Sequence, residues 1–162
     1  MKYAIYILLF LSSQLSMAQL SKIEIQATGL TCSMCSNAIN KQLKSLEAVE
    51  NVTTDLNTNT FVVYLKPNNT LTPKTFKDNV EKAGFFIGTM VVTLDSAYLN
   101  SNAARFIPLE NQAATDSEEV KIRILDKGYV TQKEFKKLEK KYAKNASYTS
   151  LNPEVFHYKL EK

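Results

Sequence analysis

The sequence predicts an α+β protein in which an antiparallel sheet carries two helices on one face. Two observations support this fold class. Three segments between residues 22 and 65 alternate, as strands with one buried face do, and residues 85–94 supply a fourth strand. Two other segments repeat apolar residues at helical spacing. Their order along the chain is βαββαβ, which is typical of this arrangement.

The first strand and the first helix come directly before and after a pair of cysteines. Residues 22–27 alternate, with Ile23, Ile25 and Ala27 on one face, and this predicts a half-buried strand. A helix is expected to run to about Leu46, because its apolar residues recur on one stripe: Cys35, Ile39, Leu43 and Leu46.

Two strands joined by a turn are expected next. Val52, Thr54 and Leu56 alternate in the first of them. The polar residues 57–60 predict the turn, and the second strand has one apolar face, formed by Phe61, Val63 and Leu65.

The second helix has clear start and stop signals. Thr72 supplies a capping hydroxyl, and Pro73 occupies the first helical position. Gly84 is a suitable stop, after which residues 85–94 supply the fourth strand. The apolar stripe of this helix consists of Phe76, Val80 and Ala83.

A smaller α+β region is expected over residues 95–162. Residues 120–124 and 155–160 are predicted strands. Between them, Thr131 and Glu134 form a capping-box sequence that opens a helix to about Lys144, with Phe135, Leu138 and Tyr142 on one side and lysines on the other. Residues 100–102 and 111–119 are predicted polar loops.

The N-terminal 18 residues have the pattern of a secretory signal. Lys2 precedes a short apolar run over residues 4–11, and Ser16 and Ala18 place small residues before a cleavage site. The apolar run is too short for a membrane span of about 20 residues. We therefore expect residues 1–18 to be a signal peptide and the protein to be exported, periplasmic or extracellular, without stable membrane insertion.

Composition excludes several classes of function. The formal net charge of +4, from 20 basic and 16 acidic residues, is too small to indicate nucleic-acid binding. Two cysteines and one histidine cannot by themselves complete a four-ligand zinc site. No Ser/His/Asp or Cys/His catalytic set is evident, so we expect a protein that is not an enzyme. We also expect it to be a monomer.

The two cysteines are the candidate metal ligands. Cys32 and Cys35 are separated by two residues, so both sulfur atoms can converge on one ion where a strand leads into a helix. The positive end of the helix dipole favours thiolates, and paired thiolates favour soft ions such as Cu(I). Because thiolates bind metal and thiols do not, metal affinity is expected to fall in acid.

The residues around this pair resemble a known family. The segment Gly29-Leu30-Thr31-Cys32-Ser33-Met34-Cys35 is similar to the GMTCxxC signature of the heavy-metal-associated domain family. The similarity continues through residues 37–39, Val49, Val52 and residues 82–85, and it covers about residues 21–94.

This resemblance implies a ferredoxin-like domain over residues 19–94, with Cys32 and Cys35 as its ligands. Family members include copper chaperones, the metal domains of metal-pumping ATPases and an exported mercury-scavenging protein. The implied function is capture and transfer of Cu(I), with Zn, Cd or Hg as other candidate ions. The implied partner is a metal donor or acceptor, such as a metal-transporting ATPase. Leu30 replaces the usual packing Met, and Phe85 is expected to shield the ion from water.

Three alternatives remain open at this point. Outside the cytosol, Cys32 and Cys35 could form a disulfide or a thiol–disulfide redox pair. Met34 and His157 are further candidate ligands, with packing or surface roles as the default. Residues 95–162 could be an interaction module regulated by metal, and the lysine face of their helix could bind an acidic partner or anionic lipid.

Overall fold

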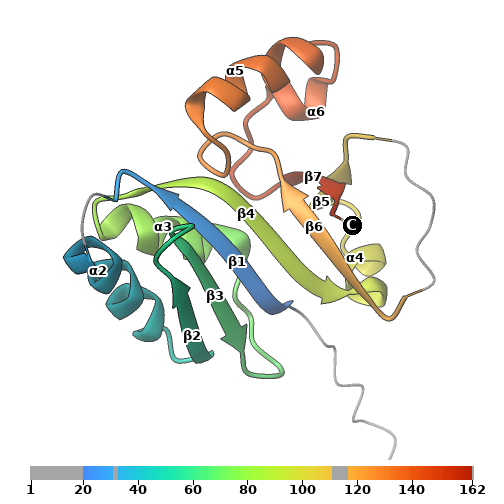
Figure 1. Ribbon diagram of the computed structural model, residues 1–162. Helices are drawn as coiled ribbons and strands as arrows, with labels where there is room; N and C mark the ends of the chain where they lie inside the picture. The colour runs from blue at the N-terminus through green and yellow to red at the C-terminus, as the bar shows by residue number, and fades with distance from the viewer. Residues whose placement is uncertain (1–19, 31–32, 111–116, 162) are drawn as a thin grey trace, which may run out of the picture.

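A single mixed sheet of seven strands organises the protein (Figure 1). The computed structural model describes residues 20–30, 33–110 and 117–161. The strands follow the spatial order β2-β3-β1-β4-β6-β7-β5. Within the described residues, no helix is long and apolar enough to cross a membrane. The predicted signal peptide lies outside the described residues.

The first half of the chain has the predicted βαββαβ order. Its four strands are antiparallel neighbours in the order β2-β3-β1-β4, and α2 and α3 pack together against the sheet. This is the ferredoxin-like arrangement, so the predicted fold class is confirmed. The elements are β1 (Leu20–Thr28), α2 (Ser33–Lys44), β2 (Val49–Asp55), β3 (Thr60–Leu65), α3 (Pro73–Lys82) and β4 (Phe86–Asp95).

The second half of the chain extends the same sheet. β6 pairs antiparallel with the free side of β4, β7 pairs antiparallel with β6, and β5 lies parallel to β7. The smaller α+β region therefore shares hydrogen bonds with the ferredoxin-like part. Its elements are α4 (Ser96–Ser101), β5 (Phe106–Pro108), β6 (Glu119–Ile124), α5 (Gln132–Lys141), α6 (Ala146–Thr149) and β7 (Phe156–Leu160).

The hydrophobic core also crosses the two halves. One cluster joins Phe61 and Phe76 of the first half to Ile122 and Phe156 of the second. A smaller cluster lies beside α5 and α6 and consists of Leu125, Val130, Phe135 and Tyr148. Burial of apolar surface in the larger cluster stabilises both halves together.

Two predictions made from local pattern are wrong. Residues 100–102 were expected to be a loop, but Asn100 lies in α4, because the Asp95 carboxylate caps this helix by accepting from Ala97 N at 2.7 Å and Tyr98 N at 3.1 Å. Leu56 was expected to continue the strand of Val52 and Thr54, but β2 ends at Asp55 and the Leu56 side chain is 57% exposed.

Helix α5 begins where predicted but is capped from one side only. Thr131 Oγ1 accepts a hydrogen bond from Glu134 N at 3.2 Å. The Glu134 carboxylate does not return to the cap, because it accepts from Arg123 Nη2 of β6 at 2.9 Å on both oxygens. The helix ends at Lys141, one turn earlier than the expected Lys144, and α6 follows as a separate short helix.

Candidate metal site

The described member of the predicted ligand pair, Cys35, lies at the start of α2, just after β1. β1 ends at Thr28, and Gly29 turns the chain with a φ of +86°, a left-handed conformation that favours glycine. Leu30 packs against the core, in keeping with the packing role expected of it. Cys32 lies outside the described residues, whereas Cys35 lies in the first turn of α2 and is half-buried.

Helix α2 holds Cys35 on a rigid support. Ile39 and Leu43 follow Cys35 at helical spacing, and both are fully buried. Asn40 Nδ2 also donates to Thr54 Oγ1 of β2 at 3.2 Å. The predicted apolar stripe is therefore confirmed at these two positions, and it directs the first turn of α2 toward the end of the sheet where β1 stops.

The electrostatic setting of this turn suits an anionic ligand. The first turn of α2 has no acidic residue, and its basic residues, Lys41 and Lys44, lie in the last turn. The first turn therefore presents backbone N–H groups and the positive end of the helix dipole. These features favour the thiolate form of a cysteine placed there.

The start of β4, which pairs with the end of β1, presents an exposed aromatic ring. Gly84, with a φ of +90°, separates α3 from β4, and Phe85 N donates to Val80 O at 3.2 Å. Phe85 packs partly against the core, whereas Phe86 is 67% exposed. Thr28 Oγ1 donates to Phe86 O at 3.2 Å, which ties the end of β1 to the start of β4. The shielding role expected for Phe85 stays a prediction.

A groove of about 880 Å³ adjoins Phe86 and connects the two halves of the protein. One wall comes from Thr28, Phe86 and Ile87 at the end of the ferredoxin-like sheet. The other wall includes Val130 and Phe135, from the start of α5 and the residues before it. The second half of the chain thus lies beside the end of the sheet at which β1 stops and β4 begins.

The two additional candidate ligands have different surroundings. Met34 is 78% exposed, so its thioether is accessible to solvent beside Cys35. His157 lies in β7, which two strands, β4 and β6, separate from β1, and it is 1% exposed. In the described ranges, no three His, Cys, Asp or Glu side chains gather as a metal site. His157 is therefore a buried histidine with other contacts.

Those contacts form a set that sequence reasoning missed. His157 lies between Asp126 and Ser147, within hydrogen-bond distance of both. Asp126 lies 31 positions before His157 and Ser147 lies 10 positions before it, so the three residues form no recognisable sequence motif. The one signal in the sequence is the single histidine of the chain, for which a packing or surface role is the default expectation.

Comparisons with known proteins match the first half of the chain. The model of the heavy-metal-associated domain matches residues 24–86, and no curated protein matches. The yeast copper transporter domain Ccc2a is 33% identical over 41% of this chain and 90% of its own, with a TM-score of 0.38. The N-terminal domain of a potential copper-translocating P-type ATPase from Bacillus subtilis is 30% identical over 41% and 81%, with a TM-score of 0.37.

CopP from Helicobacter pylori is 23% identical over 41% of this chain and 97% of its own, with a TM-score of 0.36. The family model, the βαββαβ order and the cysteine segment at the start of α2 coincide in the same part of the chain. Through residues 24–86, the chain belongs to the heavy-metal-associated domain family.

Proposed function

We propose that the protein captures one soft metal ion, Cu(I), between the thiolates of Cys32 and Cys35 and transfers it to a partner protein. The observation that carries this proposal is the position of Cys35: half-buried, in the first turn of a firmly packed helix, within a GLTCSMC segment of a heavy-metal-associated domain. Soft thiolates favour Cu(I) over hard cations. Zn, Cd and Hg are the other candidate ions.

The site is suited to transfer because two protein ligands leave the ion open to a third. A sulfur of the partner binds the ion first, and one of the two cysteines then leaves it. The exposed side chains of Met34 and Phe86 offer an apolar surface for docking at this end of the protein. The partner would be a metal donor or acceptor, such as a metal-transporting ATPase, and the thiol site itself would make and break no covalent bond in a substrate.

The protein would carry out this metal transfer outside the cytosol. The sequence of residues 1–18 supports export to the periplasm or the extracellular space. Fractionation of cells that express the full chain, with mass spectrometry of its N-terminus, tests this point. Cytosolic protein that begins at Met1 would contradict it.

An anaerobic titration tests the metal assignment. Reduced protein should bind one Cu(I) per chain tightly enough to compete with a Cu(I) chelator, and the double variant Cys32→Ser/Cys35→Ser should lose this binding. Met34→Leu is the matched control, since it removes the neighbouring thioether and keeps the thiols. Tight one-to-one binding by the double variant would overturn the assignment.

The competing redox function makes a different prediction. A thiol–disulfide exchange protein would turn over disulfide substrates in the metal-free state, with a rate that falls when either cysteine is replaced. A metal carrier would show no turnover and would pass Cu(I) to an acceptor domain in a mixing experiment. Disulfide turnover without metal transfer would favour the redox reading.

A further inference from the structure

A serine, a histidine and an aspartate form a continuous hydrogen-bonded chain in the second half of the protein. His157 Nδ1 lies 2.7 Å from Asp126 Oδ1, and His157 Nε2 lies 2.9 Å from Ser147 Oγ. Asp126 follows β6, Ser147 lies in α6, and His157 lies in β7. The tertiary fold brings these three elements together, and the cysteine pair is not involved.

The surroundings fix the orientation of the imidazole. Asp126 uses its second oxygen, Oδ2, to accept from the backbone N of His157 at 2.6 Å, so the carboxylate is held at two points. The ring of Tyr148 meets the His157 ring edge to face, with centroids 5.2 Å apart. Tyr148 is itself held by its hydroxyl, which donates to Leu125 O at 2.7 Å, and burial raises the pKa of this hydroxyl.

This geometry selects one tautomer of neutral His157. A carboxylate accepts hydrogen bonds only, so the nitrogen that faces Asp126, Nδ1, carries the proton. Nε2 is then an acceptor, and the hydroxyl of Ser147 donates to it. A serine whose proton points at the acceptor nitrogen of a carboxylate-oriented imidazole has the arrangement that activates nucleophilic serines.

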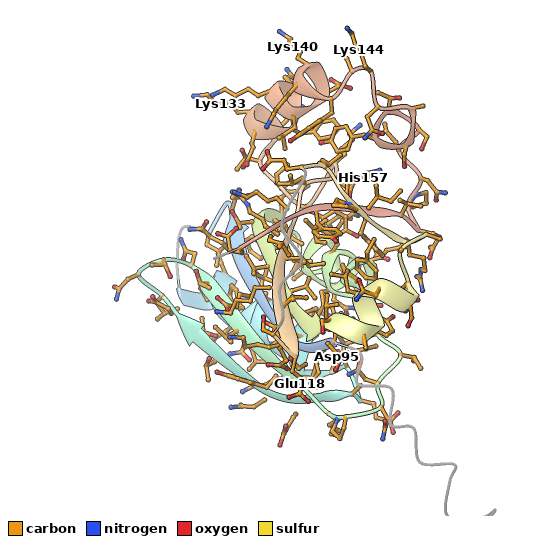
Figure 2. The ribbon with its side chains drawn as sticks, turned by 90° about the vertical axis from the view of Figure 1, so that its right-hand side faces the viewer. Asp95, Glu118, Lys133, Lys140, Lys144 and His157 are labelled. Atoms are coloured by element: carbon orange, nitrogen blue, oxygen red, sulfur yellow. The ribbon has the colours of Figure 1, made fainter. Side chains whose placement is uncertain are left out.

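Ser147 is also reachable from solvent. It is half-buried, and it lines a shallow depression of about 900 Å³ together with Lys140, Lys141 and Lys144. His157 lies below the surface, while Lys140 and Lys144 extend outward from the helical layer above it (Figure 2). The lysines favour a substrate that carries a negative charge.

We propose that Ser147 is a nucleophile for acyl transfer from small anionic esters, with His157 as its general base and Asp126 as the residue that orients the imidazole. Ser147 Oγ bonds to the ester carbonyl carbon while its proton moves to His157 Nε2. The ester C–O bond then breaks, and the same proton goes to the departing alcohol. Water, deprotonated by Nε2, cleaves the acyl–serine ester and regenerates Ser147.

Covalent labelling of the intact protein tests this proposal. The protein is treated with a fluorophosphonate and separately with the p-nitrophenyl esters of acetate and succinate, and mass spectrometry locates the adducts. Ser150 is an internal control: it is exposed in the same segment, but its hydroxyl donates to Ser147 O and touches no imidazole. Because a positioned general base contributes about 100-fold or more, Ser147 should be labelled at least about 100-fold faster than Ser150.

Two variants separate activation from structural support. Asp126→Asn can still accept from the backbone of His157 but favours the wrong tautomer, so labelling of Ser147 should fall at least about 100-fold while circular dichroism stays unchanged. The wild-type protein should turn over the anionic succinate ester faster than the acetate ester, and Ser147→Ala should abolish turnover of both. Labelling of Ser147 no faster than that of Ser150 in the folded wild-type protein would overturn the proposal and leave the three residues as a structural network.

Discussion

At the scale of single residues, Arg123 ties helix α5 to the sheet through its guanidinium. It lies on β6 opposite Val91 of β4, and its Nη2 donates to both carboxylate oxygens of Glu134 in α5 at 2.9 Å. Both side chains are largely withdrawn from water. The pair therefore fixes the start of α5 against the sheet. Thr131 caps the helix, whereas Glu134 joins it to β6.

Replacement of Glu134 should destabilise the protein measurably. Glu134→Ala leaves a largely buried guanidinium with Thr89 Oγ1, at 3.5 Å, as its other side-chain contact. A lost hydrogen bond to a charged group, reduced by partial solvent screening, corresponds to about 1–2 kcal/mol of unfolding free energy. Urea unfolding measures the difference. Glu139→Ala, on the exposed side of the same helix, is the control and should change stability by less than about 0.5 kcal/mol.

At the scale of elements, α2 connects the hydrophobic core to the thiol site. The helix carries Cys35 in its first turn and is held by Ile39 and Leu43, whose side chains are fully buried. The position of the cysteine thus depends on apolar packing one and two turns further along the helix. A substitution that alters this packing can therefore shift Cys35 without any change to the cysteine itself.

Truncation of Ile39 tests this dependence. Ile39→Ala should lower the free energy of unfolding by about 2–5 kcal/mol, because it removes buried methyl groups and leaves a cavity. Lys41→Ala, exposed two positions later, should lie within about 0.5 kcal/mol of wild type. Thermal and urea unfolding measure both variants. An equal effect of the two substitutions would contradict the packing of α2 described above.

The elements that the sequence predicts are those with a long periodic pattern. Both helices of the first half show repeated apolar positions, and β1 and β3 alternate regularly, so their burial could be anticipated. Helices α4 and α6 contain six and four residues, which is fewer than two helical turns, and strand β5 contains only three, so no repeat of apolar positions can be recognised in them. The sequence signals for these two helices are their cap residues, Asp95 and Asn145, whose side chains accept backbone hydrogen bonds at the helix starts.

The candidate sites differ in the same way. Cys32 and Cys35 are near neighbours in the chain, so local spacing is sufficient to predict a shared ligand. Asp126, Ser147 and His157 meet only because β6, α6 and β7 pack together. Pairing between strands depends on the complete fold, and a single sequence holds no direct signal for it.

At the scale of the whole molecule, buried tyrosines make stability depend on pH at the alkaline end. The pKa values of Tyr129, Tyr148 and Tyr158 are raised above the ordinary value of 10.0, mainly because the hydroxyls are buried. The folded state therefore keeps these hydroxyls protonated at a pH at which the unfolded chain loses its protons. Their contribution to stability is complete below about pH 10 and is lost as the pH rises further.

Urea unfolding across the alkaline range measures this effect. The free energy of unfolding should be similar at about pH 8 and pH 9 and should decline steadily above about pH 10. Tyr158→Phe removes one of the three ionising groups and should make the decline shallower. A free energy that rises with pH above 10 would contradict the burial of these rings.

The pairing of β4 on both sides has a consequence for self-association. Had β4 been the last strand, its open backbone groups could have joined a strand of another copy, as unpaired sheet edges tend to do. In this protein β6 occupies that position. The outermost strands of the described sheet are β2, which carries charged residues, and β5, which has three residues and ends at a proline without an N–H donor. Neither edge is a favourable template for fibril growth. By covering β4 and ending the sheet in β5, the C-terminal half should therefore keep the protein from aggregating at high concentration.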